Sequence, residues 1–310
     1  DKIIRCVGNP DTRFNEDALR ILRALRFASV YGFSIDENTS KSIFKNANLL
    51  KNIATERMTS EFLKLICGKD AVKILDAYRE TIAVIIPEIT VMFNFNQNNI
   101  HHSYDLWQHT LTALGTIEPN PVLRMTMLLH DIGKPSVKTT DNSGQSHFQG
   151  HQLESKRIAD KILHRLRLPS DFINKTLLLI EYHDVRFNGS KKLMKKVMNV
   201  LGTDLTKQLL EVEHADISAQ SEYQQEEKLG YLKTAKTHLN EIIKDNECFK
   251  LSQLDINGKD ILNLGVKEGR DVGNILDYLL MLVVDANVPN KKSILISKAK
   301  EYIYGNQINK

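Results

Sequence analysis

The chain has 310 residues, of which 42% are hydrophobic and 26% are charged. This length exceeds what one core usually organises, and the composition excludes a disordered, collagenous or low-complexity protein. The 42 basic and 38 acidic side chains leave a net charge of +4, too small to indicate a polyanionic partner without a local patch. Three widely spaced cysteines without CxxC spacing indicate neither a disulfide framework nor a thiolate zinc site, and a reducing cytoplasm is the expected location. No apolar run approaches the roughly 20 residues of a membrane-spanning helix, so we expect no membrane segment.

Apolar residues at helical spacing predict an all-α fold. The pattern is clear at 19–25 and 62–66, fades in the asparagine-rich stretch 93–103, and resumes from residue 104 to about 246. The last section places several glycines ahead of an apolar helix. We therefore expect three parts: a helical neck and body over 1–92, a second helical domain over 93–248, and a small helical tail over 249–310.

Carboxylates and arginines alternate near the amino end. Asn15 is a candidate N-cap for a helix with Glu16 and Asp17 in its first turn. In such a helix Glu16, Arg20 and Arg23 share one face, which in most proteins is a solvated face with an ion pair of about 0.2–0.5 kcal/mol. The same groups suit base recognition, because a carboxylate accepts from an exocyclic amino group while an arginine donates to a ring nitrogen or carbonyl. Such a pair would accept cytosine and adenine and reject uracil and guanine.

A second pattern combines histidines with aspartates on several predicted helices. An isolated histidine usually has only a packing role, but an adjacent His-Asp pair with further histidines and an aspartate forms a mixed nitrogen and oxygen shell for a divalent ion, whether Mg, Mn or another transition metal. Such an ion lowers the pKa of bound water and supplies hydroxide for attack on a phosphoester. The candidate ligands are His109, His130, Asp131, His151, His183 and Asp216, with Lys134 four residues after His130.

Three sequence runs carry a resemblance to a known family. GNPDTRFNEDALRILRALRFA at 8–28, YGFSID at 31–36 and ERMTSEFLKLI at 56–66 resemble the neck of class II tRNA nucleotidyltransferases, the CCA-adding enzymes, and of related bacterial poly(A) polymerases. The resemblance implies tRNA as a partner and CTP and ATP as substrates, with the EDxxRxxR motif as the protein template that pairs with the incoming base.

The same resemblance assigns roles within the motif. Asp17 and Arg20 would read the base, Glu16 would orient the arginine, and Arg23 would reach the nucleotide or its phosphates. Glu56-Arg57 matches the motif that braces the template helix in this family.

The order His, His-Asp, Asp resembles the HD phosphohydrolase superfamily, and many bacterial CCA-adding enzymes carry an HD domain after the neck. The resemblance implies metal ligation by His109, His130, Asp131 and Asp216, and a second metal or substrate phosphate at His151 and His183. It implies catalytic roles for His130, Asp131 and Lys134, and phosphatase or 2′,3′-cyclic phosphodiesterase activity.

Family members also carry a nucleotidyltransferase head with a glycine-serine turn and paired carboxylates. No such segment occurs in these 310 residues, so we expect the chain to be a fragment without the head that adds no nucleotides alone. Two other functions stay open: an autonomous HD phosphohydrolase and a non-catalytic RNA-binding module. Poly(A) polymerase is a variant of the first reading. The lysines of 191–196 and 291–300 are either phosphate contacts or solvated helix faces.

Overall fold

The computed structural model describes residues 2–98, 104–267 and 269–308, with the side chains of 306–308 excepted. The expected all-α class is confirmed, since helices dominate and the described strands are two short pairs. β1 (Ile3–Ile4) pairs in parallel with β2 (Ser34–Ile35), and β3 (Thr139–Thr140) pairs antiparallel with β4 (Ser146–His147). No described helix combines the length and apolarity needed to cross a membrane. Five residues of the asparagine-rich stretch, 99–103, lie outside the described residues.

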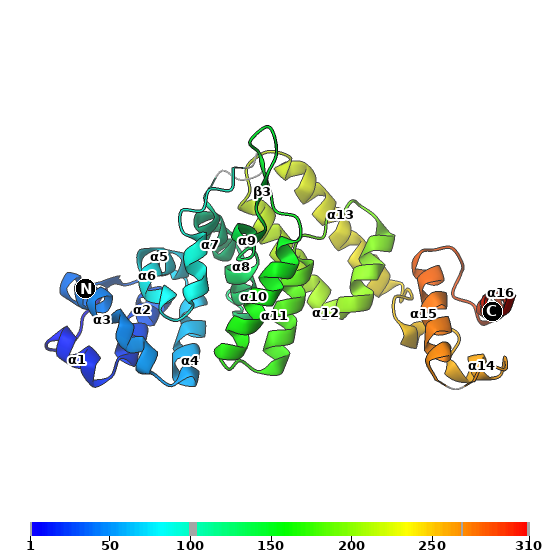
Figure 1. The fold of residues 1–310 in the computed structure, drawn as a ribbon, viewed down its shortest axis with the longest axis horizontal. Coiled ribbons are helices and arrows are strands. Elements are labelled where there is room, and N and C mark those ends of the chain that lie inside the picture. Colours follow the sequence, from blue (N-terminus) through cyan, green and yellow to red (C-terminus); the bar gives the residue numbers. More distant parts are fainter. Residues whose placement is uncertain (1, 99–103, 268, 309–310) are drawn as a thin grey trace. The chain divides into compact units, whose positions relative to one another are not determined.

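The chain divides into two compact units, which are shown in Figure 1 as parts of one ribbon. The first unit runs up to Val185 and includes Gln208–Leu229. Its helices, with three-residue-per-turn helices labelled η, are α1 (Pro10–Glu16), α2 (Leu19–Tyr31), α3 (Glu37–Asn46), η1 (Ala47–Asn52), α4 (Thr55–Ile66), α5 (Ala71–Ala77), α6 (Arg79–Ala83), η2 (Pro87–Met92), α7 (Leu106–Thr116), α8 (Pro121–Leu129), α9 (Lys134–Val137), α10 (His151–Arg165) and α11 (Ser170–Tyr182).

The second unit comprises Arg186–Lys207 and Gly230–Lys310. Two long helices, α12 (Lys191–Ser218) and α13 (Gln225–Lys244), contribute residues to both units, and α12 is interrupted at Gly202, whose φ of 71° is not helical. The remaining elements of this unit are η3 (Leu251–Gln253), α14 (Gly258–Leu262), α15 (Arg270–Val284) and α16 (Lys292–Ile308). The three-part division expected from the sequence stays a prediction.

The start of the first helix differs from the prediction. Asn9, not Asn15, is the N-cap of α1: its side chain accepts from Thr12 N at 3.1 Å, and Pro10 occupies the first helical position. The helix ends at Glu16, and Asp17 is extended (φ −151°, ψ 101°). The expected continuous helical face from Glu16 to Arg23 is therefore wrong, because a break separates α1 from α2.

The core of the first unit begins where α2 packs on α4. Leu22 and Leu25 of α2 and Phe62 and Leu65 of α4 are completely buried. Burial of such a side chain contributes about 1.5–3 kcal/mol, so these positions fix α2 on α4. α2 then ends at Tyr31, and the following Gly32 adopts the left-handed conformation (φ 67°) that glycine tolerates best.

The lysine-rich start of α12 forms ion pairs within the second unit. Lys191 and Lys195 contact Glu247 at 2.5 and 2.7 Å, and Lys192 and Lys196 each lie 3.1 Å from Asp285. These lysines thus join α12 to the segments that follow α13 and α15, a structural role that the sequence pattern did not reveal.

Candidate functional site

Asp131 lies at the centre of a buried cluster of four histidines and two aspartates. Its Oδ2 atom lies 3.2 Å from His130 Nε2 and 3.5 Å from His109 Nε2. Its Oδ1 atom lies 3.4 Å from His151 Nε2 and 3.5 Å from His183 Nε2. One carboxylate therefore faces two pairs of imidazoles through its two oxygens.

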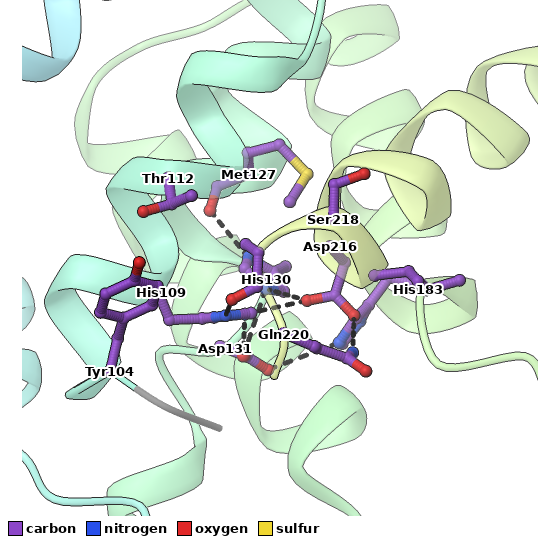
Figure 2. Close-up of polar contacts among 12 residues, drawn as sticks. Tyr104, His109, Thr112, Met127, His130, Asp131, His183, Asp216, Ser218 and Gln220 are labelled. Carbon is purple, nitrogen blue, oxygen red and sulfur yellow. Dashed lines mark hydrogen bonds and ion pairs between the residues drawn. The ribbon is translucent and has the colours of Figure 1, made fainter. Parts of the chain in front are cut away.

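Asp216 completes the first half of the cluster. Its Oδ1 atom lies 2.9 Å from His109 Nε2 and 3.3 Å from His130 Nε2. Figure 2 shows the Asp216 carboxylate facing these two histidines. The ligand atoms of His109, His130, Asp131 and Asp216 all lie within 4.8 Å of one another, as do those of Asp131, His151 and His183. The structure thus brings together all six metal ligands expected from the sequence.

Several helices supply these residues near their ends. His109 belongs to α7, whose N-cap Asp105 accepts from Gln108 N at 2.8 Å, and His130 follows the last residue of α8. His151 is the first residue of α10, His183 follows α11, and Asp216 lies in the last turn of α12. Helix ends place polar side chains beside one another without burying a run of polar backbone.

Every histidine of the cluster uses its Nδ1 atom to contact a main-chain carbonyl oxygen. The acceptors are Ala219 O for His109 at 3.2 Å, Met127 O for His130 at 2.8 Å, Phe148 O for His151 at 2.9 Å and Ile180 O for His183 at 2.6 Å. A carbonyl can only accept, so each Nδ1 carries the proton. In the neutral ring, Nε2 then presents its lone pair to the cluster, the usual arrangement of metal-binding histidines.

Three atoms at the centre remain without a well-oriented hydrogen bond among the described residues. They are His130 Nε2 and both carboxylate oxygens of Asp131, all buried. Lys134 Nζ forms an ion pair with Asp131 Oδ2 at 2.7 Å. This contact does not reach the other oxygen, Oδ1, which stays without a hydrogen bond in the described part of the chain. Buried polar atoms rarely lack partners, so the arrangement fits a bound divalent ion.

The electrostatics of the cluster also favour a cation. Burial disfavours the charged form of His130, but the carboxylates of Asp131 and Asp216 more than offset this and raise its pKa to about 10. The pKa of His109 is raised for the same reason. Burial similarly acts against ionisation of Asp131 and Asp216, but the neighbouring imidazoles lower the pKa of both carboxyl groups well below the usual range. A divalent ion would replace protons held on these histidines.

Lys134 lies inside the cluster and is 5% exposed. Besides Asp131, its ammonium group donates to Gln97 Oε1 at 3.1 Å. Gln97 is 1% exposed and lies 37 residues earlier in the chain, and no sequence pattern singled it out.

Gln220 is another contact residue that sequence reasoning missed. Its Nε2 donates to Asp216 Oδ2 at 2.7 Å, and its Oε1 accepts from Lys228 Nζ at 2.7 Å. Figure 2 shows Gln220 beside Asp216. Gln220 follows Asp216 by four residues, a spacing that brings two side chains together on a helix. This was a weak indication of contact, because α12 ends at Ser218.

The amino-terminal candidates meet at the junction of α1 and α2. Arg20 Nη1 lies 2.7 Å from Glu16 Oε2 and donates to Arg13 O at 2.9 Å. The hydrogen bond from Arg20, opposed by partial burial and reinforced by Arg13, lowers the pKa of Glu16. Asp17 Oδ1 accepts from Leu19 N at 3.1 Å, and Arg57 Nη2 lies 3.5 Å from Asp17 Oδ2.

Other residues of these motifs have different partners. Within the described part of the chain, no hydrogen bond or ion pair joins Arg23 to Glu16, Asp17 or Arg20; Arg23 is exposed, with its guanidinium 6.0 Å from the Phe27 ring centroid. Glu56 pairs with Arg167 in the turn after α10 at 2.5 Å, so its carboxylate contacts a later segment of the first unit.

Two family profiles match the chain. Residues 32–93 match "Probable RNA and SrmB- binding site of polymerase A", and residues 151–299 match domain 2 of tRNA nucleotidyltransferases. The first match covers the helices that follow the arginine motif, and the second covers His151, His183 and Asp216.

Curated relatives and a solved structure agree with these profiles. The CC-adding tRNA nucleotidyltransferase of Thermus thermophilus is 28% identical over 294 residues, which is 89% of this chain and 65% of that protein. The CCA-adding enzyme of Ligilactobacillus salivarius is 27% identical over 97% of this chain and 63% of its own length. The chain therefore spans less than two thirds of either relative. The crystal structure of the Bacillus stearothermophilus enzyme with CTP has the same fold (TM-score 0.67, 22% identity), covering all of this chain and 67% of that one.

Proposed function

Since this chain belongs to the family of class II CCA-adding enzymes and poly(A) polymerases, we propose that it acts in the addition of CCA to the 3′ ends of tRNA in the cytoplasm, with CTP and ATP as substrates. The observation that carries the proposal is the contact set around Glu16. Arg20 is held by Glu16 and Arg13 O, while Asp17 contacts Arg57, so both side chains have defined partners at the junction of two helices.

This arrangement supports base selection by Asp17 and Arg20. A carboxylate and a guanidinium with fixed supports pair with the edge of cytosine or adenine, which carries an amino group. Uracil and guanine present a carbonyl there and would leave the carboxylate unpaired. Arg23, which is exposed on α2, is in our proposal a contact to the nucleotide phosphates.

Nucleotide binding by the full chain tests this proposal. Equilibrium dialysis should show CTP and ATP binding more tightly than UTP and GTP. Arg20→Ala should weaken CTP and ATP binding about tenfold or more, because a charged hydrogen bond contributes about 1.5–3 kcal/mol. Arg5→Ala is the matched control, since Arg5 pairs with Asp36 outside the motif. Equal binding of all four nucleotides, or an unchanged affinity in Arg20→Ala, would contradict the proposal, and binding of ATP without CTP would favour a poly(A) polymerase.

We further propose that the histidine and aspartate cluster is a metal-dependent phosphohydrolase site of the HD type. His109, His130, Asp131 and Asp216 would hold one divalent ion, and Asp131, His151 and His183 would hold a second. Bound there, such an ion supplies a hydroxide at neutral pH. Lys134 brings a fixed positive charge beside Asp131 and would bind the phosphate oxygens of a phosphomonoester or a 2′,3′-cyclic phosphodiester.

The reaction can be measured on a nucleoside 2′,3′-cyclic phosphate. Water adds to phosphorus, one bond from phosphorus to a ribose oxygen breaks, and that oxygen takes the proton. His130→Ala with Asp131→Ala should abolish both bound metal and hydrolysis, because the pair supplies one imidazole and the one carboxylate that belongs to both candidate ligand groups. Asp141→Ala serves as control, since Asp141 contacts His147 in an exposed turn. Hydrolysis that persists in the double variant would assign the activity elsewhere.

A further inference from the structure

Two half-buried phenylalanine rings lie beside the metal-ligand cluster. Phe148 precedes His151 by three residues, and its carbonyl oxygen is the 2.9 Å acceptor for His151 Nδ1. The Phe148 ring centroid lies 5.6 Å from Lys134 Nζ, the ammonium group that pairs with Asp131. This ring is therefore fixed at the margin of the cluster by residues that build the cluster.

Phe95 extends the aromatic surface. Its ring centroid lies 6.2 Å from that of Phe148, with the planes tilted by 58°. Lys138 Nζ lies 4.9 Å from the Phe95 centroid and donates to Asn96 O at 3.0 Å. The two phenylalanine rings and the ammonium groups of Lys134 and Lys138 thus lie close together. Lys134 links this group to Asp131 of the metal-ligand cluster.

The segment that carries Phe95 is tied to the hairpin of β3 and β4. Asn98 Nδ2 donates to Gly144 O at 2.5 Å, and Ser146 N donates to Asn98 O at 3.0 Å. These bonds join the two segments that carry Phe95 and Phe148 without a ligand, so little ordering of the backbone would be needed on binding. Asp216 and His151 are the most exposed of the six residues of the metal-ligand cluster, with side chains 15% and 10% exposed.

We propose that Phe95 and Phe148 form a base-stacking subsite that sets the preference of the metal cluster for phosphoesters carrying a nucleobase. Every nucleobase has a π face that packs on an aromatic ring, while Lys134 and Lys138 suit the phosphate groups of the same ligand. A free nucleotide and the terminal nucleotide of an RNA share this chemistry. The inference rests on the proposed phosphohydrolase site and names two residues that set its specificity.

Ligand binding to the full chain loaded with Mn²⁺ tests the subsite by calorimetry. The two probes are adenosine 2′-monophosphate and inorganic phosphate. Phe148→Leu and Phe95→Leu should each weaken binding of the nucleotide about tenfold, because a stacked base contributes substantially to affinity, and should leave phosphate binding unchanged. Phe93→Leu is the control, since the Phe93 ring packs on Trp107 at 4.9 Å and not on Phe148; both affinities should remain at the wild-type value.

The outcomes separate the subsite from the function on which it rests. Chain that binds no Mn²⁺, or no phosphate when loaded, refutes the metal site and the subsite with it. Loaded protein that binds phosphate but gains nothing from the nucleoside overturns the subsite alone, as does an equal loss of both ligands in the phenylalanine variants. A trinucleotide ending in a 3′-phosphate distinguishes the sources: tighter binding than the mononucleotide indicates an RNA end, and equal binding indicates a free nucleotide.

Discussion

Glu213 is a buried carboxyl group one helical turn before Asp216. It is 5% exposed, and its Oε1 atom has no hydrogen-bond partner among the described residues. Burial, reinforced by the negative charges of Asp216 and Asp184, raises its pKa well above the usual range. Glu213 therefore keeps its proton in the folded protein at pH values where the unfolded chain has lost it.

This shift predicts how stability depends on pH. A folded pKa raised above the unfolded value gives stability that is present below the unfolded pKa and is lost as pH rises toward the folded pKa. Because of Glu213, the urea concentration at the unfolding midpoint of the wild type should decrease as the pH is raised from 5 to 8. Glu213→Gln buries a neutral side chain at every pH, so this variant should show a smaller decrease. Exposed Glu226→Gln should leave the decline unchanged. An equal decline in wild type and Glu213→Gln would show that Glu213 is already ionised.

At the same scale, the sequence was sufficient to single out six candidate ligands that the structure brings together, and insufficient for their neighbours. A His-Asp pair with further histidines is rare enough to be informative by itself, whereas Gln97, Gln220 and Phe148 belong to common residue types. Their positions follow from contacts between distant segments, such as the 37 residues between Gln97 and Lys134, which local pattern does not encode.

At the scale of elements, helix type was predictable and helix boundaries were not. Asn9-Pro10 is the stronger start signal, because it combines a capping side chain with a proline at the first helical position, yet the acidic pair after Asn15 suggested a later start. The contact between Glu16 and Arg20 survives the break, since Asp17 redirects the chain into α2 over only two residues.

The approach of α10 to the His-Asp turn depends on Gly133. A Cβ atom at this position would lie 2.5 Å from Ser155 N and 2.8 Å from His151 O, both main-chain atoms that cannot move aside. Gly133 N also donates to Ser155 Oγ at 2.9 Å. The glycine thus allows the first turn of α10 to bring His151 to Asp131.

Gly133→Ala should therefore lower the free energy of unfolding by about 1–3 kcal/mol, the usual cost of overpacking. It should also weaken metal binding, because His151 is displaced from Asp131. Chemical denaturation and metal titration measure the two effects. Gly144→Ala is the comparison, since no atom lies within 4 Å of its added methyl group, although its φ of 84° carries backbone strain; that variant should retain metal binding. Full metal affinity in Gly133→Ala would mean that α10 tolerates the shift.

At the scale of the whole molecule, all six candidate metal ligands belong to the first compact unit. We expect scanning calorimetry to resolve two transitions, one for each unit. Mn²⁺ at about 100 times its dissociation constant should stabilise the first unit by about 2.7 kcal/mol and raise only its transition temperature. The His130→Ala, Asp131→Ala double variant should show no shift. A single transition that moves as a whole would indicate that the two units unfold together.

The carbonyl acceptors of the four imidazoles have a consequence for how this centre can change. Any residue at positions 127, 148, 180 and 219 supplies a main-chain oxygen. Substitutions there therefore keep the acceptor that holds the proton on Nδ1 of each histidine. Ring orientation is thereby inherited from the course of the backbone. Changes in the surrounding side chains can therefore accumulate while the four Nε2 atoms continue to face Asp131.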